Sequence, residues 1–270
     1  MAVQLQDVKR AVDLGHDERL LPVADELAPL LTQPGLVRGS VLAAQGPGAL
    51  TLATAFAAEV LRTGGWVTAV GLGRMGVSAV AERGASLDRW VFVDEPGDVA
   101  AEVLNALIGN VDVILLAAGV RLADAHSRRL RARLRERGTV VIEVAEGHAR
   151  GVGAFSPAGP RGVGAFSPDV TLTVERAAWT GLGHGHGRLR ERRAEVVAVG
   201  RGAASLPRRA VLWLPDATGR IAPVCGAIDT VSWPASSWPA PADSSQAGIS
   251  AAGISETDSD VVVPLQRRAG

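Results

Sequence analysis

Short apolar runs alternate with longer amphipathic segments through the middle of the chain. Five apolar runs have the length of buried strands: 41–45, 66–70, 90–93, 111–116 and 139–144. The segments between them predict helices: 50–62, 77–83, 99–108 and 121–137. Continuous apolar strands separated by helices are typical of a parallel sheet with helices on both faces. The pattern therefore predicts an α/β fold.

The pattern changes after the fifth apolar run. The heptapeptide GVGAFSP occurs at 151–157 and again at 162–168, and we interpret region 150–169 as a surface loop enlarged by duplication. Three later segments alternate polar and apolar residues: 170–174, 188–199 and 208–214. Such alternation predicts antiparallel or edge strands after the parallel sheet.

The two ends of the chain differ from the central region, which we place at 36–216. Apolar residues recur at helical spacing between Leu20 and Leu31, so we expect 1–35 to be a helical N-terminal lead-in. Ser, Pro, Ala and Gly dominate 217–270, which predicts a mostly disordered C-terminal tail. Trp233 and Trp238, each followed by Pro, lie in this tail as candidate anchors for a partner.

Composition narrows the classes of function. The 270 residues carry 28 basic and 28 acidic side chains, a balance that argues against coating DNA by bulk electrostatics. The single cysteine excludes an internal disulfide and a cysteine-rich metal site. The N-terminus lacks the apolar core of a signal peptide, and no apolar run is long enough to cross a membrane. We therefore expect a cytoplasmic protein without membrane contact.

The turn between the first apolar run and the first helix lies where a P-loop would lie. It contains Gly46, Pro47, Gly48 and Thr51. A working P-loop needs a second Gly to wrap the phosphates, then a Lys, then a Ser or Thr for Mg²⁺. This turn is too short and has no Lys, so the sequence predicts a degenerate nucleotide site.

The surrounding segments resemble the start of a RecA-type domain. The resemblance lies in 21–31 (LPVADELAPLL), in 35–40 (GLVRGS) and in the strand, loop and helix that follow. The chain is most similar to the ImuA-type RecA homologues of actinobacterial mutagenesis cassettes. The similarity extends through Asp216, and the most family-like segments are 179–193 (WTGLGHGHGRLRERR) and 208–215 (RRAVLWLP). It implies a RecA-like sheet, mostly parallel, with a degenerate P-loop and antiparallel C-terminal strands.

The resemblance also implies that the RecA catalytic positions are lost. The catalytic Glu that ends the second strand corresponds to a position near Leu72, and the Walker B Asp corresponds to Ala117. Without the Lys, the base and the metal carboxylate, nothing remains to neutralise a triphosphate. We therefore expect no enzymatic activity, no cofactor and no metal.

The resemblance to ImuA-type proteins also implies a function. ImuA-type proteins act with ImuB, a catalytically inactive Y-family polymerase homologue, and with an error-prone replicative-type polymerase in SOS-induced translesion DNA synthesis. We expect this chain to be a scaffold of that mutasome that binds the ImuB-type protein. A RecA-like cell-division inhibitor of the SOS response is an alternative that differs in its partner.

Two other motifs carry further hypotheses. The sequence GLGRMG at 71–76 follows an apolar run and precedes a predicted helix, with Asp94 after the next run, so an NAD(P)-dependent oxidoreductase is a second alternative. Four arginines crowd the segment before 194 and form a candidate surface for a partner or for weak DNA contact: Arg188, Arg190, Arg192 and Arg193. In a strand, alternate members of this set would share one face. The arginines of helix 121–137 are interpreted as a solvated face.

Overall fold

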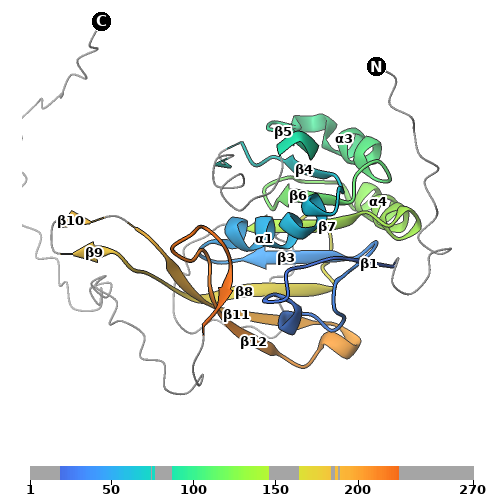
Figure 1. Cartoon of the computed structure of the whole chain (residues 1–270). Helices are drawn as coiled ribbons and strands as arrows, with labels where there is room; N and C mark the ends of the chain where they lie inside the picture. The colour runs from blue at the N-terminus through green and yellow to red at the C-terminus, as the bar shows by residue number, and fades with distance from the viewer. Residues whose placement is uncertain are drawn as a thin grey trace, which may run out of the picture. The chain divides into compact units, whose positions relative to one another are not determined.

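The computed structural model describes residues 19–73, 75–76, 87–145, 164–183, 186–187 and 189–224, all within the first of two compact units, 1–233 and 234–270. Several predicted features lie outside the described residues: the helix 77–83, the first GVGAFSP copy, Arg188, Trp233 and Trp238. The described residues form one layered structure around a single large sheet (Figure 1).

The sheet has nine strands in the order β13-β12-β11-β8-β3-β7-β6-β4-β5. Their bounds are β3 Val41–Gln45, β4 Val67–Val70, β5 Trp90–Val93, β6 Val113–Ala117, β7 Val140–Ala145, β8 Val170–Trp179, β11 Arg192–Gly200, β12 Arg208–Trp213 and β13 Ala222–Pro223. Pairing is parallel from β8 through β5 and antiparallel from β8 to β13. The predicted α/β class, with a mostly parallel sheet and antiparallel C-terminal strands, is confirmed. One detail differs, because β8 is parallel to β3 on one side and antiparallel to β11 on the other.

Helices cover both faces of the parallel strands. The α-helices are α1 Ala49–Arg62, α3 Ala100–Leu107 and α4 Asp124–Arg137. Phe56 of α1 packs in one core cluster with Leu42 and Ile142, whereas Leu104 of α3 and Leu134 of α4 pack in a second cluster. The second cluster contains the strand neighbours Val41 and Val141. Because consecutive strand residues point to opposite faces, α1 lies on one face and α3 and α4 lie on the other.

The predicted helix over the N-terminal apolar residues is wrong where the structure describes it. Strand β1 (Leu20–Leu21) pairs with β2 (Leu36–Val37), and the chain between them contains the 3₁₀ helix η3 (Ala28–Leu30). Pro22 and Pro29 cannot donate the backbone hydrogen bonds of an α-helix interior, so the apolar spacing is satisfied by turns instead. The apolar side chains still enter the core on the α1 face: Leu21, Leu27, Leu30 and Leu36.

Two further expectations change at the end of the duplicated region and at the C-terminal edge. Ala165 and Phe166, in the second GVGAFSP copy, are each 6% exposed and pack in the α3–α4 cluster, so this part of the predicted surface loop is core. Residues that the sequence placed in the disordered tail include β13, which pairs with β12. None of the helices in the described ranges has both the length and the apolar character needed to cross a bilayer.

Candidate functional site

The predicted nucleotide site lies at the carboxyl edge of the parallel strands. Gly46 follows β3, Gly71 follows β4 and Ala118 follows β6. In the sheet, β7 lies between β3 and β6, and β4 is the next strand after β6. Gly46 N donates to Ala145 O at 3.2 Å, and Ala118 N donates to Val144 O at 3.0 Å. The residues that follow β3 and β6 are therefore joined to the end of β7, at the edge where an open α/β sheet places its ligands.

The turn that enters α1 is closed on itself. Gly46 has a φ of 96° and Gly48 a φ of 87°, values that favour glycine. Ala49 N donates to Gly46 O at 3.1 Å, and Leu52 N donates to Gly48 O at 3.0 Å. A P-loop directs its amides at a bound phosphate, whereas the Ala49 amide here is bonded inside the turn.

The side chain of Arg192 fills the space beside this turn. A Cβ atom placed on Gly48 would overlap the guanidinium group of Arg192, so the two residues are in direct contact. Arg192 is 7% exposed, and its Nε donates to Leu214 O at 2.7 Å. Its guanidinium carbon lies 5.1 Å from the ring centroid of Trp179. A buried cation therefore stands at the amino end of α1, where a P-loop holds an anion.

The contacts of Arg192 explain how its guanidinium group is held at the amino end of α1. The amino end of a helix carries a positive partial charge and attracts anions, so α1 itself does not favour the guanidinium. The carbonyl of Leu214 and the face of Trp179 supply the attraction. The backbone fixes the same residue, because Arg192 N donates to Pro215 O at 2.8 Å and Leu214 N donates to Arg192 O.

The positions that the RecA resemblance assigned to the catalytic Glu and the Walker B Asp lie in apolar surroundings. Leu72 packs against the core cluster on the α1 face, and Ala117 packs against the cluster on the other face. Thr51, the hydroxyl of the predicted degenerate site, is half-buried in the first turn of α1. Gln45 turns toward β8, where its Nε2 donates to Thr173 Oγ1 at 2.8 Å.

Glu143 is a buried acid that the sequence analysis did not single out. It lies in β7 between Ile142 and Val144, which face α1, so its side chain points to the opposite face. Its Oε1 accepts a hydrogen bond from Phe166 N at 2.7 Å. Burial raises the pKa of Glu143 to about 7, although the backbone bonds from Phe166 and Ala165 oppose the shift. The signal in the sequence is an acid inside the apolar run VVIEVA.

The predicted arginine face is wrong in its geometry. Strand β11 begins at Arg192, where pairing with Trp179 begins, so Arg190 lies before the strand and is exposed. Arg192 is buried against Gly48, and Arg193 is half-buried. The predicted alternation required a strand that begins earlier. Of the predicted set, Arg190 is the described member that remains on the surface.

Ion pairs join Arg176 of β8 and Arg209 of β12 to the glutamates Glu175 and Glu195. Arg176 lies 2.9 Å from Glu195, and Arg209 lies 2.8 Å from Glu175 and 3.2 Å from Glu195. The hydrogen bond to Glu175 is the largest of the interactions that raise the pKa of Arg209. Glu175 and Glu195 thus hold two of the arginines of these strands in ion pairs.

The residues of the dinucleotide alternative are partly described. Gly71 has a φ of 74°, and a Cβ placed on Gly73 would lie 3.5 Å from Asp94 Cβ, so the glycine turn and the acid are adjacent. The rest of the motif's helix lies outside the described residues. Within the described part of the chain, no group of three His, Cys, Asp or Glu side chains is placed to hold a metal.

Comparison with known proteins gives two matches. Residues 29–149 match the family model described as the MT3502 N-terminal domain. The chain is also similar to the uncharacterized protein Rv3395c of Mycobacterium tuberculosis (strain ATCC 25618 / H37Rv), with 34% identity over 106 residues. That alignment covers 39% of this chain and 52% of the relative, so the chain spans about half the length of the curated relative that it matches.

The family match covers one part of the candidate site. It includes the Gly46–Gly48 turn, α1 and the parallel strands β3 to β7. It ends before β8 and β11, so Trp179 and Arg192 lie outside it. The matched region supplies the turn, and a segment beyond the match supplies the side chain that fills it.

Proposed function

We propose that this protein is a non-catalytic, RecA-like accessory protein of SOS-induced, error-prone translesion DNA synthesis, and that it binds an ImuB-type inactive polymerase homologue. The observation that carries the non-catalytic part is the contact of Arg192 with Gly48. The RecA-like interpretation is supported by the strand, turn and helix of β3 and α1 inside a parallel sheet, and by the antiparallel strands after β8.

Several features of the Gly46–Gly48 turn oppose nucleotide turnover. The turn lacks a Lys, and Leu72 and Ala117 stand where the base and the metal carboxylate are expected. A triphosphate would also have to displace Arg192 from the Leu214 carbonyl and from Trp179. Phosphoryl transfer depends on charge stabilisation by positioned groups. A site that lacks these groups and is filled by its own chain supports a structural role for the fold.

The role that follows is that of a docking scaffold. The family-like segments 179–193 and 208–215 contribute the end of β8, the start of β11 and strand β12. At the base of the β8–β11 hairpin, Trp179 is 41% exposed and Leu189 is 48% exposed. Arg190 N donates to Thr180 O at 3.1 Å, so the two sides of the hairpin are joined there. We place the contact with the ImuB-type partner on this hairpin and on Trp233 and Trp238. The error-prone polymerase and DNA would be reached through the partner.

The test is affinity co-purification after co-expression of the full chain with the ImuB-type protein of the same genome. A truncation after Asp216 is unsuitable because it removes β13 from its pairing with β12. We expect co-elution to be lost in either of two double variants, Leu189→Ser with Arg190→Glu, or Trp233→Ala with Trp238→Ala. Leu206→Ser is the matched control, since Leu206 is 72% exposed outside the hairpin.

Three outcomes decide between the proposals. Failure of the unmodified chain to co-elute contradicts the mutasome role. Capture of a cell-division protein in place of the ImuB-type partner would instead support the inhibitor alternative. A change in tryptophan fluorescence on addition of NADH, abolished by Gly73→Val, would support the oxidoreductase alternative, because the added side chain would approach Asp94 at the glycine turn.

A further inference from the structure

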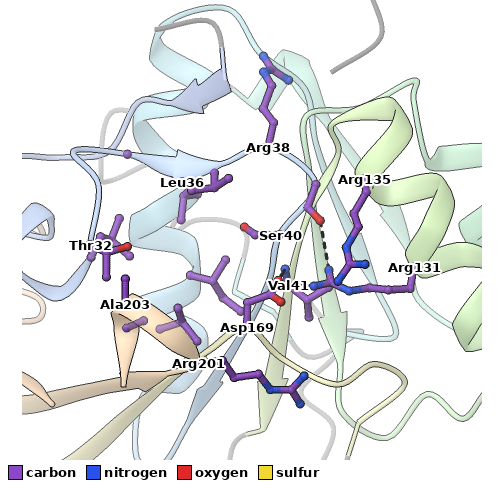
Figure 2. A pocket seen from close by; sticks show the side chains of 17 residues that line it. Thr32, Leu36, Arg38, Ser40, Val41, Arg131, Arg135, Asp169, Arg201 and Ala203 are labelled. Atoms are coloured by element: carbon purple, nitrogen blue, oxygen red, sulfur yellow. Dashed lines mark hydrogen bonds and ion pairs between the residues drawn. The ribbon is translucent and has the colours of Figure 1, made fainter. Parts of the chain in front are cut away.

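A second hollow lies at the amino ends of β3 and β8, away from the Gly48 turn (Figure 2). Its volume is about 330 Å³. Its walls come from the chain between η3 and β3, from α4, from the start of β8 and from the loop after β11. This volume lies at the lower end of the range of about 300–1,000 Å³ that small-molecule pockets have, so it suits a small organic molecule better than a single inorganic ion.

Asp169 fixes the floor of this pocket. Its carboxylate accepts a hydrogen bond from Val41 N at 2.8 Å and pairs with the guanidinium of Arg131. Arg131 also donates to Gly39 O at 3.1 Å. The backbone of Asp169 joins the same elements, because its N donates to Val41 O and its O accepts from Arg201 N. One residue thus ties β3, α4 and the β11 loop together.

The wall formed by the chain around β2 is held by close packing. Gly39 has a φ of 78°, and a Cβ on it would lie 2.8 Å from Arg135 Cα. A Cβ on Gly35 would lie 2.5 Å from Leu21 O. The chain therefore packs directly on α4 at Gly39 and on β1 at Gly35.

The charge of the lining is positive. Four arginines line the pocket: Arg38, Arg131, Arg135 and Arg201. Arg38 is paired with Asp112 at 3.0 Å and, in Figure 2, points away from the other three. Asp169 neutralises Arg131. Among the described side chains no acid is paired with Arg135 or Arg201, and Arg201 donates to the neutral hydroxyl of Ser167.

We propose that this pocket binds a small organic anion whose phosphate or carboxylate group is held by Arg135 and Arg201. Guanidinium groups remain charged at all physiological pH values and bind both kinds of group through paired hydrogen bonds. The apolar body of the ligand packs against Val170 and Ala203, apolar lining residues that are at least partly exposed. An amine is excluded because Asp169 is already neutralised. This site lies outside the proposed mutasome contact and does not depend on it.

The test is isothermal titration of the full chain at low ionic strength with phenyl phosphate and, separately, with benzoate. Saturable binding with a Kd below about 1 mM is expected for at least one of them, and which one binds identifies the preferred group. Phenol, which lacks the charge, and inorganic phosphate, which lacks the apolar body, should each bind at least about tenfold more weakly. Arg135→Gln with Arg201→Gln should weaken binding at least about tenfold, the effect of losing charged hydrogen bonds.

The matched control is Arg129→Gln, which changes an exposed arginine of α4 that does not line the pocket. Binding should be unchanged in this variant. Absence of saturable binding by both probes overturns the proposal, as does binding that Arg135→Gln with Arg201→Gln leaves intact. Inorganic phosphate binding as tightly as phenyl phosphate contradicts the organic ligand. Binding of an oligothymidylate that depends on the same two arginines, without binding of either probe, would make the surface a nucleic-acid contact instead.

Discussion

Gly48 and Arg192 are in contact although they lie on segments far apart in the sequence, one at the amino end of α1 and one at the start of β11. Two requirements meet at Gly48. Its φ of 87° favours glycine, and the space that a Cβ would take is already filled by the guanidinium group. The site therefore depends on both residues together, which a double-mutant cycle can measure.

Gly48→Ala should destabilise the fold by about 2–4 kcal/mol, through backbone strain at positive φ and displacement of Arg192. Urea unfolding measures this difference. Gly64→Ala is the matched control, because Gly64 has a φ of 89° with nothing within 4 Å of its added Cβ, and it should cost about 1 kcal/mol. In the Arg192→Ala background the cost of Gly48→Ala should fall to that of the control. Equal costs in both backgrounds would show that the contact carries no energy.

Glu143 should make the stability of the protein fall as pH rises. Its pKa is about 7 in the folded state and 4.5 as the reference, so the folded protein binds the proton more tightly. The stabilisation is fully present below pH 4.5 and is lost as pH rises through about 7, with a total of about 3 kcal/mol. Unfolding by urea between pH 4.5 and 8 measures the slope. Glu143→Gln keeps an acceptor for Phe166 N and should flatten it; an unchanged slope would assign the dependence to other groups.

The two GVGAFSP copies should differ in their effect on stability. Phe166→Ala removes a buried side chain of the second copy and should cost about 3–5 kcal/mol. Deletion of residues 151–161 leaves the second copy complete and shortens the connection from β7 to β8, which should change the free energy of unfolding by less than about 1 kcal/mol. Thermal or urea unfolding compares the two variants. A loss of several kcal/mol on deletion would mean that the first copy is also structural.

The ion pair of Arg131 and Asp169 should support the fold as well as the pocket. Asp169→Ala leaves Arg131, a half-buried guanidinium, without its carboxylate and removes the acceptor for Val41 N, so a loss of about 2–4 kcal/mol is expected. Asp124→Ala, a change of an exposed acid in the first turn of α4, is the control and should cost less than about 1 kcal/mol. If the two variants lose the same free energy of unfolding, the ion pair of Asp169 with Arg131 does not contribute specifically to stability.

The sequence predicted the parallel strands well because each is a short apolar run bounded by turns. Val41–Gln45 and Trp90–Val93 have the predicted bounds, and α1 begins one residue before the predicted helix. The N-terminal segment was mispredicted because apolar spacing outweighed Pro22 and Pro29. Its leucines are still core residues. The apolar spacing therefore predicted correctly that these side chains are buried, but not the secondary structure that buries them.

The candidate sites were predicted less well, because both depend on contacts between distant segments. The Gly46–Gly48 turn was singled out because it lacks the Lys of a P-loop. Arg192, however, was expected on the surface, because the start of β11 is set by its pairing with Trp179, which the sequence does not reveal. The arginines of α4 were expected to be solvated. Arg131 instead meets Asp169, a contact that exists because β8 returns to the amino end of β3.

The most direct test of the central claim is equilibrium titration of the full chain with a fluorescent ATP analogue in the presence of Mg²⁺. We predict no saturable binding up to about 1 mM, a limit of about 4 kcal/mol of binding free energy, for the unmodified protein. The same result is expected for Arg192→Ala, because removing the guanidinium does not supply the missing Lys or the missing carboxylates. Saturable binding in the micromolar range by the unmodified protein would contradict the account, since it would require a functional nucleotide site where Arg192 now lies.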